Sequence, residues 1–223
     1  MAQQREDARV REGHVCPWWL IRTFDNPLRR VFHRPEQVLS ELVRPGDQCL
    51  DVGCGIGYFT VPMAALVGDR GSVTAVDVQP RMLEGVARRA ARRGLEARIR
   101  LRLATDAGPL VEQPVDFVLT FWMLHEVPDQ AGLLRSLFAA LRSGGRFLLV
   151  EPRLHVSGAA FAVSAARATA IGFEVLAKPA IALSRAVLFA RPSAPAGGVL
   201  PLTRPSASAG STRAARGASG CSG

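Results

Sequence analysis

The sequence contains little lysine, few aromatic residues and no long apolar run. Lys178 is the one lysine among 28 basic residues, and aromatic residues make up 6% of the 223 positions. A membrane-spanning helix needs about 20 consecutive apolar residues. No run approaches that length, so we expect no transmembrane segment. The first residues are polar and charged, which predicts no signal peptide and a cytoplasmic location.

Cysteine is also scarce. The four cysteines include no C-x-x-C pair, so the spacing indicates neither a zinc site nor a redox pair, and no metal site is expected. A disulfide framework is not expected in a cytosolic chain of this size. Cys49 lies in an apolar run and is predicted to be a small core residue.

Acidic residues are fewer than basic ones, and the formal net charge is +9. A basic chain suggests a nucleic-acid partner. However, most arginines are scattered over predicted helix surfaces or the C-terminal segment, and no stripe combines aromatic with basic side chains as single-strand binding requires. We therefore expect solvated arginine faces and no nucleic-acid partner. The alternatives are an acidic partner attracted by the positive field and an enzyme that acts on RNA, whose binding would weaken with salt. No pattern specifies an oligomeric state.

Apolar residues make up 48% of the chain, which suits one globular domain. Apolar periodicity predicts alternating strands and helices. The expected strands cover residues 48–52, 72–78, 99–104, 115–121, 146–150, 173–176 and 186–189. The expected helices cover residues 35–43, 60–67, 80–93, 129–141 and 159–170.

Alternation of this kind predicts an α/β fold with a mostly parallel sheet and helices on both faces. The connection between the last two strands is too short for a helical crossover, so they should form an antiparallel hairpin. The prediction is a Rossmann-like, seven-stranded, mostly parallel sheet with an antiparallel terminal hairpin. The domain should span residues 35–191. Residues 1–34 precede it as a segment that includes Trp18 and Trp19, either packing on the domain or closing over a ligand as a lid.

Residues 192–223 differ in composition from the rest. Of these 32 residues, 23 are Pro, Ser, Ala or Gly. Such a segment cannot bury enough apolar surface to offset the entropy of ordering, so a disordered tail is predicted.

A glycine-rich loop follows the first predicted strand, in Leu50-Asp51-Val52-Gly53-Cys54-Gly55-Ile56-Gly57. Glycines allow a tight turn and close approach of the backbone to a ligand. The next helix would present its positive end to a carboxylate or phosphate. The dinucleotide fingerprint is G-x-G-x-x-G, whereas this loop reads G-x-G-x-G and has Tyr58 at the last fingerprint position. The Asp51 carboxylate would repel a pyrophosphate but can accept a hydrogen bond from an ammonium group.

Acidic residues follow the second and third predicted strands. Asp77 can accept hydrogen bonds from both hydroxyls of a ribose, and its alternative role is to cap the helix that follows. Asp106, after the third strand, can receive an adenine amino group or be an ordinary loop aspartate.

The fourth predicted strand ends in Phe121-Trp122-Met123-Leu124-His125-Glu126. His125 is the candidate catalytic residue, because an imidazole titrates near neutrality and can act as a general base. Glu126 could act as the base instead. The alternative for both residues is that they orient the loop and cap the next helix, whose predicted N-cap residue is Asp129. A displacement reaction can depend mainly on alignment of the reacting groups, in which case an essential acid or base is not required.

These motifs resemble those of a known family. DVGCGIG, AVDVQPRML, VDFVLTFWMLHEVPD and LRSGGRFLLVEP look like the successive motifs of class I S-adenosylmethionine (SAM)-dependent methyltransferases. The branch with the strongest resemblance contains the ubiquinone and menaquinone biosynthesis C-methyltransferases. The resemblance spans roughly residues 35–191.

The resemblance implies SAM as cofactor, held by Asp51, Gly53, Gly55, Gly57 and Asp77, with Asp106 as a further contact and Phe121 bordering the methyl group. It implies a methyltransferase that acts on a small-molecule or lipid-like acceptor. A SAM-binding protein without activity and an NAD-dependent oxidoreductase are the alternatives.

Overall fold

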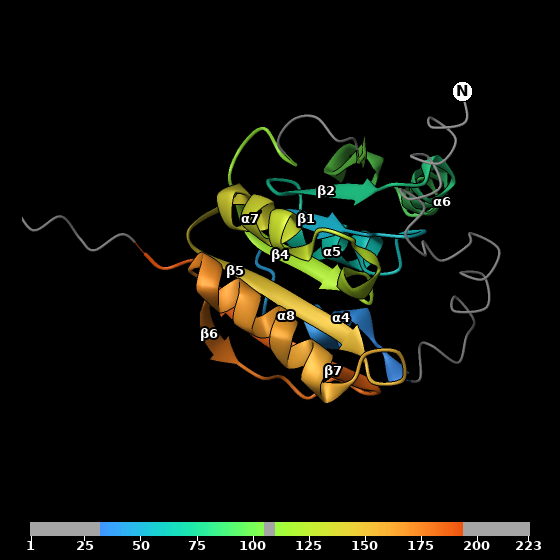
Figure 1. Ribbon diagram of the computed structural model, residues 1–223. Coiled ribbons are helices and arrows are strands. Elements are labelled where there is room, and N and C mark those ends of the chain that lie inside the picture. The colour runs from blue at the N-terminus through green and yellow to red at the C-terminus, as the bar shows by residue number, and fades with distance from the viewer. Residues whose placement is uncertain (1–31, 105–109, 194–223) are drawn as a thin grey trace, which may run out of the picture. The chain divides into compact units, whose positions relative to one another are not determined.

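The computed structural model describes residues 32–104 and 110–193. These residues form one seven-stranded sheet with strand order β3-β2-β1-β4-β5-β7-β6 (Figure 1). The strands are β1 (Gln48–Val52), β2 (Ser72–Asp77), β3 (Ile99–Leu103), β4 (Val115–Phe121), β5 (Leu141–Pro152), β6 (Glu174–Ala177) and β7 (Ser184–Ala190). Strands β1 to β5 pair with one another in parallel, whereas β7 is antiparallel to both β5 and β6. The predicted fold class is confirmed.

Helices cover both faces of this sheet. They are α4 (Pro35–Leu39), α5 (Thr60–Val67), α6 (Pro80–Ala91), α7 (Gln130–Ala140) and α8 (Gly158–Ile171), with short 3-10 turns η1 (Glu96–Arg98) and η2 (Leu124–Glu126). Leu134 of α7 and Phe161 of α8 join one hydrophobic cluster. Leu39 of α4 and Met63 of α5 join the cluster on the opposite face. Figure 1 shows α7 and α8 together in front of the sheet.

Strand β4 shows why the two faces separate. Successive side chains of a strand point to opposite faces. Val118 accordingly enters the cluster under α7 and α8, whereas Phe117 and Leu119 enter the cluster under α5. All three are fully buried. This is the near-continuous apolar run expected of a strand covered on both sides.

Strand β5 is longer than predicted, because it begins at Leu141 instead of residue 146. Leu141 pairs with Val115, and the ladder has an irregularity before Arg146. The backbone N–H of Gly144 donates to the carbonyl of Arg191, and that of Arg191 donates to Gly145. These long-range bonds hold the glycine pair in the sheet, so the turn expected at residues 143–145 is instead an irregular part of β5. The prediction that α7 ends at residue 141 is wrong by one residue.

The other boundaries agree with the predictions to within about two residues, except that helix α4 ends at Leu39 rather than at residue 43. Cys49 and Cys54 are buried. Burial raises the pKa of both thiols, so neither side chain supplies a thiolate. In the part of the chain that the structure describes, no helix is long and apolar enough to span a membrane.

Two of the predicted segments lie almost entirely outside the residues that the structure describes. Residues 1–31 hold nearly all of the predicted N-terminal segment, including Cys16, Trp18 and Trp19, and residues 194–223 hold nearly all of the predicted tail. Of the first segment, Phe32 is half exposed and His33 is buried.

Candidate functional site

The glycine loop leaves β1 at the edge of the sheet where the five parallel strands end. The backbone N–H groups of Gly53 and Cys54 both donate to the carbonyl of Val76, at 2.9 and 3.1 Å, which binds the loop to the end of β2. Gly53, Gly55 and Gly57 all have positive φ, at 68°, 53° and 83°. Positive φ is the conformation that favours glycine, so the loop geometry explains the G-x-G-x-G pattern.

The glycines differ in their surroundings. A Cβ on Gly53 would lie 2.7 Å from Cβ of Met123, and one on Gly57 would lie 3.2 Å from Val86. A Cβ on Gly55 would meet nothing within 4 Å. Gly53 and Gly57 are therefore required for packing, whereas Gly55 presents bare backbone to open space. That open space fits close approach by a ligand.

Asp51 lies under this loop as a buried carboxylate. Its side chain is 2% exposed, and Oδ2 accepts from the hydroxyl of Thr60 at 2.6 Å. Thr60 is the first residue of α5, whose N-cap residue Phe59 provides no side-chain cap. A buried charge needs partners. The Thr60 hydroxyl is one such partner of Asp51. Asp51 also lies at the positive end of helix α5, where the helix dipole stabilises a carboxylate.

Asp77 ends β2 and contacts the glycine loop directly. Its Oδ2 accepts from the backbone N–H of Gly55 at 3.0 Å, and its Oδ1 accepts from that of Gln79 at 2.9 Å. Burial raises the pKa of this carboxyl group, and the backbone donors partly offset that effect. Gln79 is the N-cap residue of α6. Asp77 therefore contacts the start of α6, which was its alternative role, and it also contacts the glycine loop.

Exposed apolar side chains border Asp77. Val78 is 57% exposed and Leu103 is 41% exposed. Asp77 and Leu103 are register partners in β2 and β3. Exposed apolar surface next to a carboxylate suits a ligand with a flat apolar ring and hydroxyl groups. The sequence analysis missed Val78, although it directly follows the acidic residue. Asp106 lies outside the described residues.

Phe121 ends β4 inside an aromatic cluster. It is 7% exposed, and its ring centroid lies 4.2 Å from that of Phe59 and 5.3 Å from that of His33. Trp122 follows with φ of 61° and donates from Nε1 to the hydroxyl of Ser184 at 2.9 Å. The geometry therefore shows Phe121 mainly as a packing residue that supports the loop.

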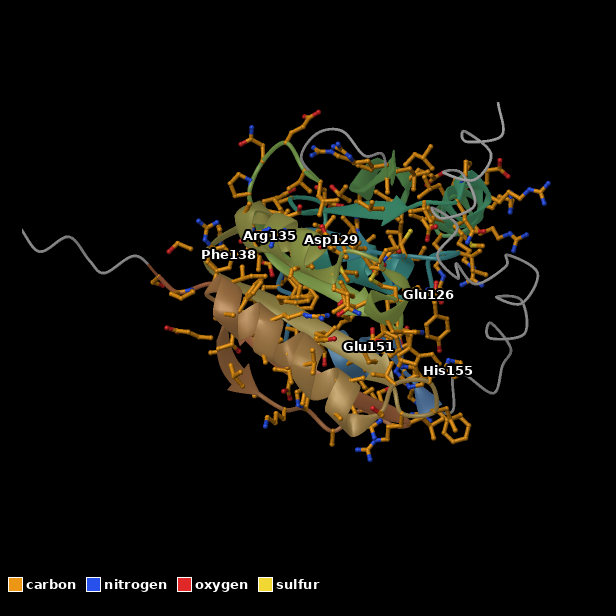
Figure 2. The ribbon with its side chains drawn as sticks, viewed as in Figure 1. Glu126, Asp129, Arg135, Phe138, Glu151 and His155 are labelled. Carbon is orange, nitrogen blue, oxygen red and sulfur yellow. The ribbon has the colours of Figure 1, made fainter. Side chains whose placement is uncertain are left out.

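The loop after β4 lies against the glycine loop. Met123 is the side chain that a Cβ on Gly53 would strike, and His125 follows two residues later. Nδ1 of His125 lies 2.5 Å from Oε2 of Glu151, and the backbone N–H of Leu124 donates to Oε1 of the same carboxylate at 2.9 Å. Glu151 raises the pKa of His125 through this hydrogen bond, and burial opposes the rise. Figure 2 shows Glu151 near the end of β5, in the region that also holds Glu126 and His155.

Glu151 was not predicted as a site residue from the sequence. The signal was available, because an acidic residue ends the apolar run of the fifth strand as Asp77 ends the second. The predicted cap of α7 is confirmed for Asp129, which accepts from the backbone N–H of Gly132 at 2.8 Å. Within residues 32–104 and 110–193, no group of three or more His, Cys, Asp or Glu side chains is arranged to hold a metal ion.

A family model described as a methyltransferase domain matches residues 49–145. This span contains β1 to β4 and the glycine loop. These residues, less than half of the chain, are similar to a methyltransferase domain. The resemblance stated from the motifs is therefore confirmed.

Curated relatives point in the same direction. A demethylmenaquinone methyltransferase of Symbiobacterium thermophilum is 36% identical over 121 residues, which cover 54% of this chain and 48% of the relative. A ubiquinone biosynthesis O-methyltransferase of Xanthomonas euvesicatoria is 31% identical over 164 residues, which cover 72% of this chain and 64% of the relative. The chain thus spans about half to just under two thirds of the length of these relatives.

Solved structures show the same fold. A SAM-dependent methyltransferase from Aquifex aeolicus superposes with a TM-score of 0.70 at 20% identity, over 79% of this chain and 100% of that chain. A methyltransferase from Pyrococcus furiosus superposes with a TM-score of 0.56 at 22% identity, over 74% of this chain and 81% of that chain. Both likenesses support the class I fold.

Proposed function

We propose that the protein is a SAM-dependent methyltransferase acting on a small molecule. The observation that carries the proposal is the pairing of Gly55 and Asp77. Gly55 presents backbone without a side chain to open space, and Asp77 holds the N–H of that residue. The match of residues 49–145, which include this loop, to a methyltransferase domain supports the proposal.

The donor site follows from the acceptors that the loop provides. SAM supplies an electrophilic methyl group on a sulfonium when it is bound. Asp51 would accept from its ammonium group, and Asp77 would accept from its ribose hydroxyls. Gly55 would allow the backbone to approach closely, and the exposed side chains of Val78 and Leu103 would contact the adenine ring. Asp106 would contact the adenine amino group, as proposed from the sequence.

The acceptor side is the loop after β4, which carries His125. The relatives' names support an acceptor of the quinone type, since one acts on demethylmenaquinone and another in ubiquinone biosynthesis. We propose a ring compound of that kind. An NAD-dependent oxidoreductase is disfavoured, because Asp51 and the G-x-G-x-G loop suit a cationic amino acid moiety better than a pyrophosphate.

Calorimetric titration of the full chain with SAM, and separately with NAD, tests the proposal. Saturable binding of SAM and none of NAD is the expected result. Binding of NAD without SAM would overturn it. In the same samples, transfer of labelled methyl groups to quinol acceptors should produce S-adenosylhomocysteine. SAM binding without transfer to any quinol would contradict the acceptor assignment while leaving the donor site standing.

A further inference from the structure

Strand β6 forms one edge of the sheet, and β7 is its only neighbour among the strands that the structure describes. All four residues of β6 are exposed. The apolar side chains of Val175 and Leu176 are 49% and 53% exposed. An edge strand has unpaired backbone groups on its outer side, and an apolar edge strand readily pairs with a strand of another chain. The outer side of β6 is therefore a surface that a partner can cover.

Helix α8 continues this apolar surface. The backbone N–H of Phe173 donates to the carbonyl of Ala168 at 3.2 Å, which holds the start of β6 against the last turn of α8 (Figure 1). Val163 of α8 is 49% exposed. Arg167 is the one charged residue of α8, and it donates to Oε1 of Gln130 on α7 at 3.0 Å. The outward face of a surface helix normally carries charged residues, so α8 has the composition of a helix that is covered.

The ladder between β6 and β7 contains an irregularity at Leu176. Val175 pairs with Phe189 and Ala177 pairs with Leu188, so Leu176 has no register partner in β7. An extra residue of this kind is a bulge, and a bulge limits the length over which a further strand can pair. We therefore expect a short, closed contact with one other strand and no extended sheet.

Two opposite charges lie at the ends of this edge. Glu174 and Lys178 are the charged residues of the segment 171–180, and both are exposed. Residues of an extended chain are spaced by about 3.3 Å, so these two lie about 13 Å apart, too far to pair with each other. Neither forms a salt bridge with any other residue that the structure describes. Both charges are thus available to a partner.

We propose that β6 and the outward face of α8 form the interface of a two-fold symmetric dimer. In this dimer β6 of one protomer runs antiparallel to β6 of its partner, and Leu176 lies opposite Leu176 of the partner subunit. This register brings Glu174 opposite Lys178 of the partner subunit, and the same contact occurs a second time by symmetry. Opposite charges that face each other across antiparallel strands attract.

The charge pattern favours a second copy over other partners. An anionic membrane surface would attract Lys178 and repel Glu174, and a strand of unrelated sequence would match both charges only by chance. A second β6 in the antiparallel direction matches both at once. The dimer also leaves the candidate site open, because β6 is the lateral edge of the sheet and the glycine loop lies at the ends of the parallel strands. This interface is therefore independent of the proposed function.

Sedimentation of the full chain and of charge-reversed variants tests the interface. The wild type should sediment as a dimer. Glu174→Lys and Lys178→Glu should each raise the dissociation constant of the dimer by about 10-fold or more, because each variant creates two contacts between like charges. The double variant exchanges the two charges and should restore the wild-type dissociation constant. Arg135→Glu, a charge reversal on the exposed side of α7, is the matched control and should change nothing.

Chemical cross-linking tests the register. Lys178 is the one lysine of the chain, and a carbodiimide joins an ammonium group directly to a carboxylate that it contacts. In a mixture of ¹⁴N- and ¹⁵N-labelled chains, we expect a peptide that links Lys178 to Glu174 and carries both labels. Circular dichroism of each variant verifies that loss of the dimer is not loss of the fold.

The contrary outcomes are distinct. A wild-type chain that sediments as a monomer at all concentrations would overturn the dimer, as it would if the chain's own terminal residues covered β6. A dimer in which the double variant is weaker than either single variant would overturn the two-fold charge pairing. A dimer whose Lys178 is linked to another carboxylate, or to Glu174 of the same chain alone, would overturn the register. Loss of SAM binding in the wild type would refute the proposed function and leave the dimer standing.

Discussion

The backbone N–H of Gly55 donates to Oδ2 of Asp77 at 3.0 Å. This bond ties the glycine loop after β1 to the residue that ends β2. Because the other carboxylate oxygen accepts from Gln79, one side chain holds the loop and the start of α6 together. Substitution at Asp77 should therefore affect ligand binding and local structure, and the two effects can be separated.

Replacing Asp77 with alanine should weaken SAM binding by about 1–3 kcal/mol, because hydroxyl groups of the ligand lose a buried acceptor. Calorimetric titration measures the change. Asp129→Ala is the matched control, since Asp129 also accepts a backbone N–H at a helix start. Both variants should lose about 0.5–2 kcal/mol of stability from the helix start. Equal SAM affinity in the Asp77 variant and the wild type would contradict the assignment.

Gly55→Ala should fold but bind SAM far more weakly. The added Cβ meets no protein atom within 4 Å, so the folding cost is limited to the positive φ, about 1–2 kcal/mol. Gly94→Ala has a similar φ of 63° and the same open surroundings at the end of α6. It should lose similar stability in urea titrations and keep its SAM affinity. If both variants bind SAM like the wild type, the loop does not hold the ligand.

Gly53→Ala should destabilise the fold more than Gly55→Ala does. Its Cβ would lie 2.7 Å from Cβ and Cγ of Met123, so the loop after β4 must move. We expect a loss of about 2–4 kcal/mol, from the positive φ together with overpacking. Urea denaturation of the two variants compares them directly. A smaller loss at Gly53 than at Gly55 would show that the two loops are not in contact.

The ion pair of His125 with Glu151 should make stability depend on pH. The folded pKa of His125 is raised above its ordinary value of 6.5, first by the Glu151 hydrogen bond. The stabilisation is thus fully present below about pH 6.5 and is lost as pH rises through the folded pKa. The free energy of unfolding of the wild type minus that of His125→Gln should fall as the pH rises above about 6.5. A difference that stays flat or rises over this range would refute the pair.

The Trp122 indole and the Ser184 hydroxyl should be energetically coupled. Nε1 donates to Oγ at 2.9 Å, and Ser184 is 3% exposed. Trp122→Phe removes the donor and keeps an aromatic ring, and Ser184→Ala removes the acceptor. The double-mutant cycle in urea should give a coupling of about 0.5–1.5 kcal/mol. Additive effects would mean that the bond contributes nothing to holding the β4 loop.

Local sequence patterns predicted most of the fold. The apolar run of residues 115–121 gave β4 its observed limits, and Pro80 marked the start of α6. Strand β5 was predicted too short, because its pairing beyond Gly145 depends on Arg191, far along the chain. Helix α4 was predicted too long, because the apolar stripe of residues 35–43 continues into a turn.

The site was predicted in part. The glycine loop and Asp77 could be found because strand-loop-helix signals place them at one edge of a parallel sheet. The positions of Gly55 and Asp77 relative to each other depend on pairing between β1 and β2, in which Val52 lies opposite Val76. The rings of Phe59 and His33 pack against Phe121, a contact that the sequence did not indicate. The role of Phe121 at the ligand stays a prediction.

Periodicity, glycine spacing and strand-end carboxylates are local properties, and by themselves they determined the fold class, the glycine loop and the family. The tertiary structure alone decided that Glu151 meets His125 across 26 residues of sequence. It also decided that, of the three glycines in the loop after β1, only Gly55 faces open space. Both depend on which strands are neighbours and how loops pack at their ends. These are contacts between residues far apart in the chain, and the pattern of residue types along the sequence does not specify which individual residues meet.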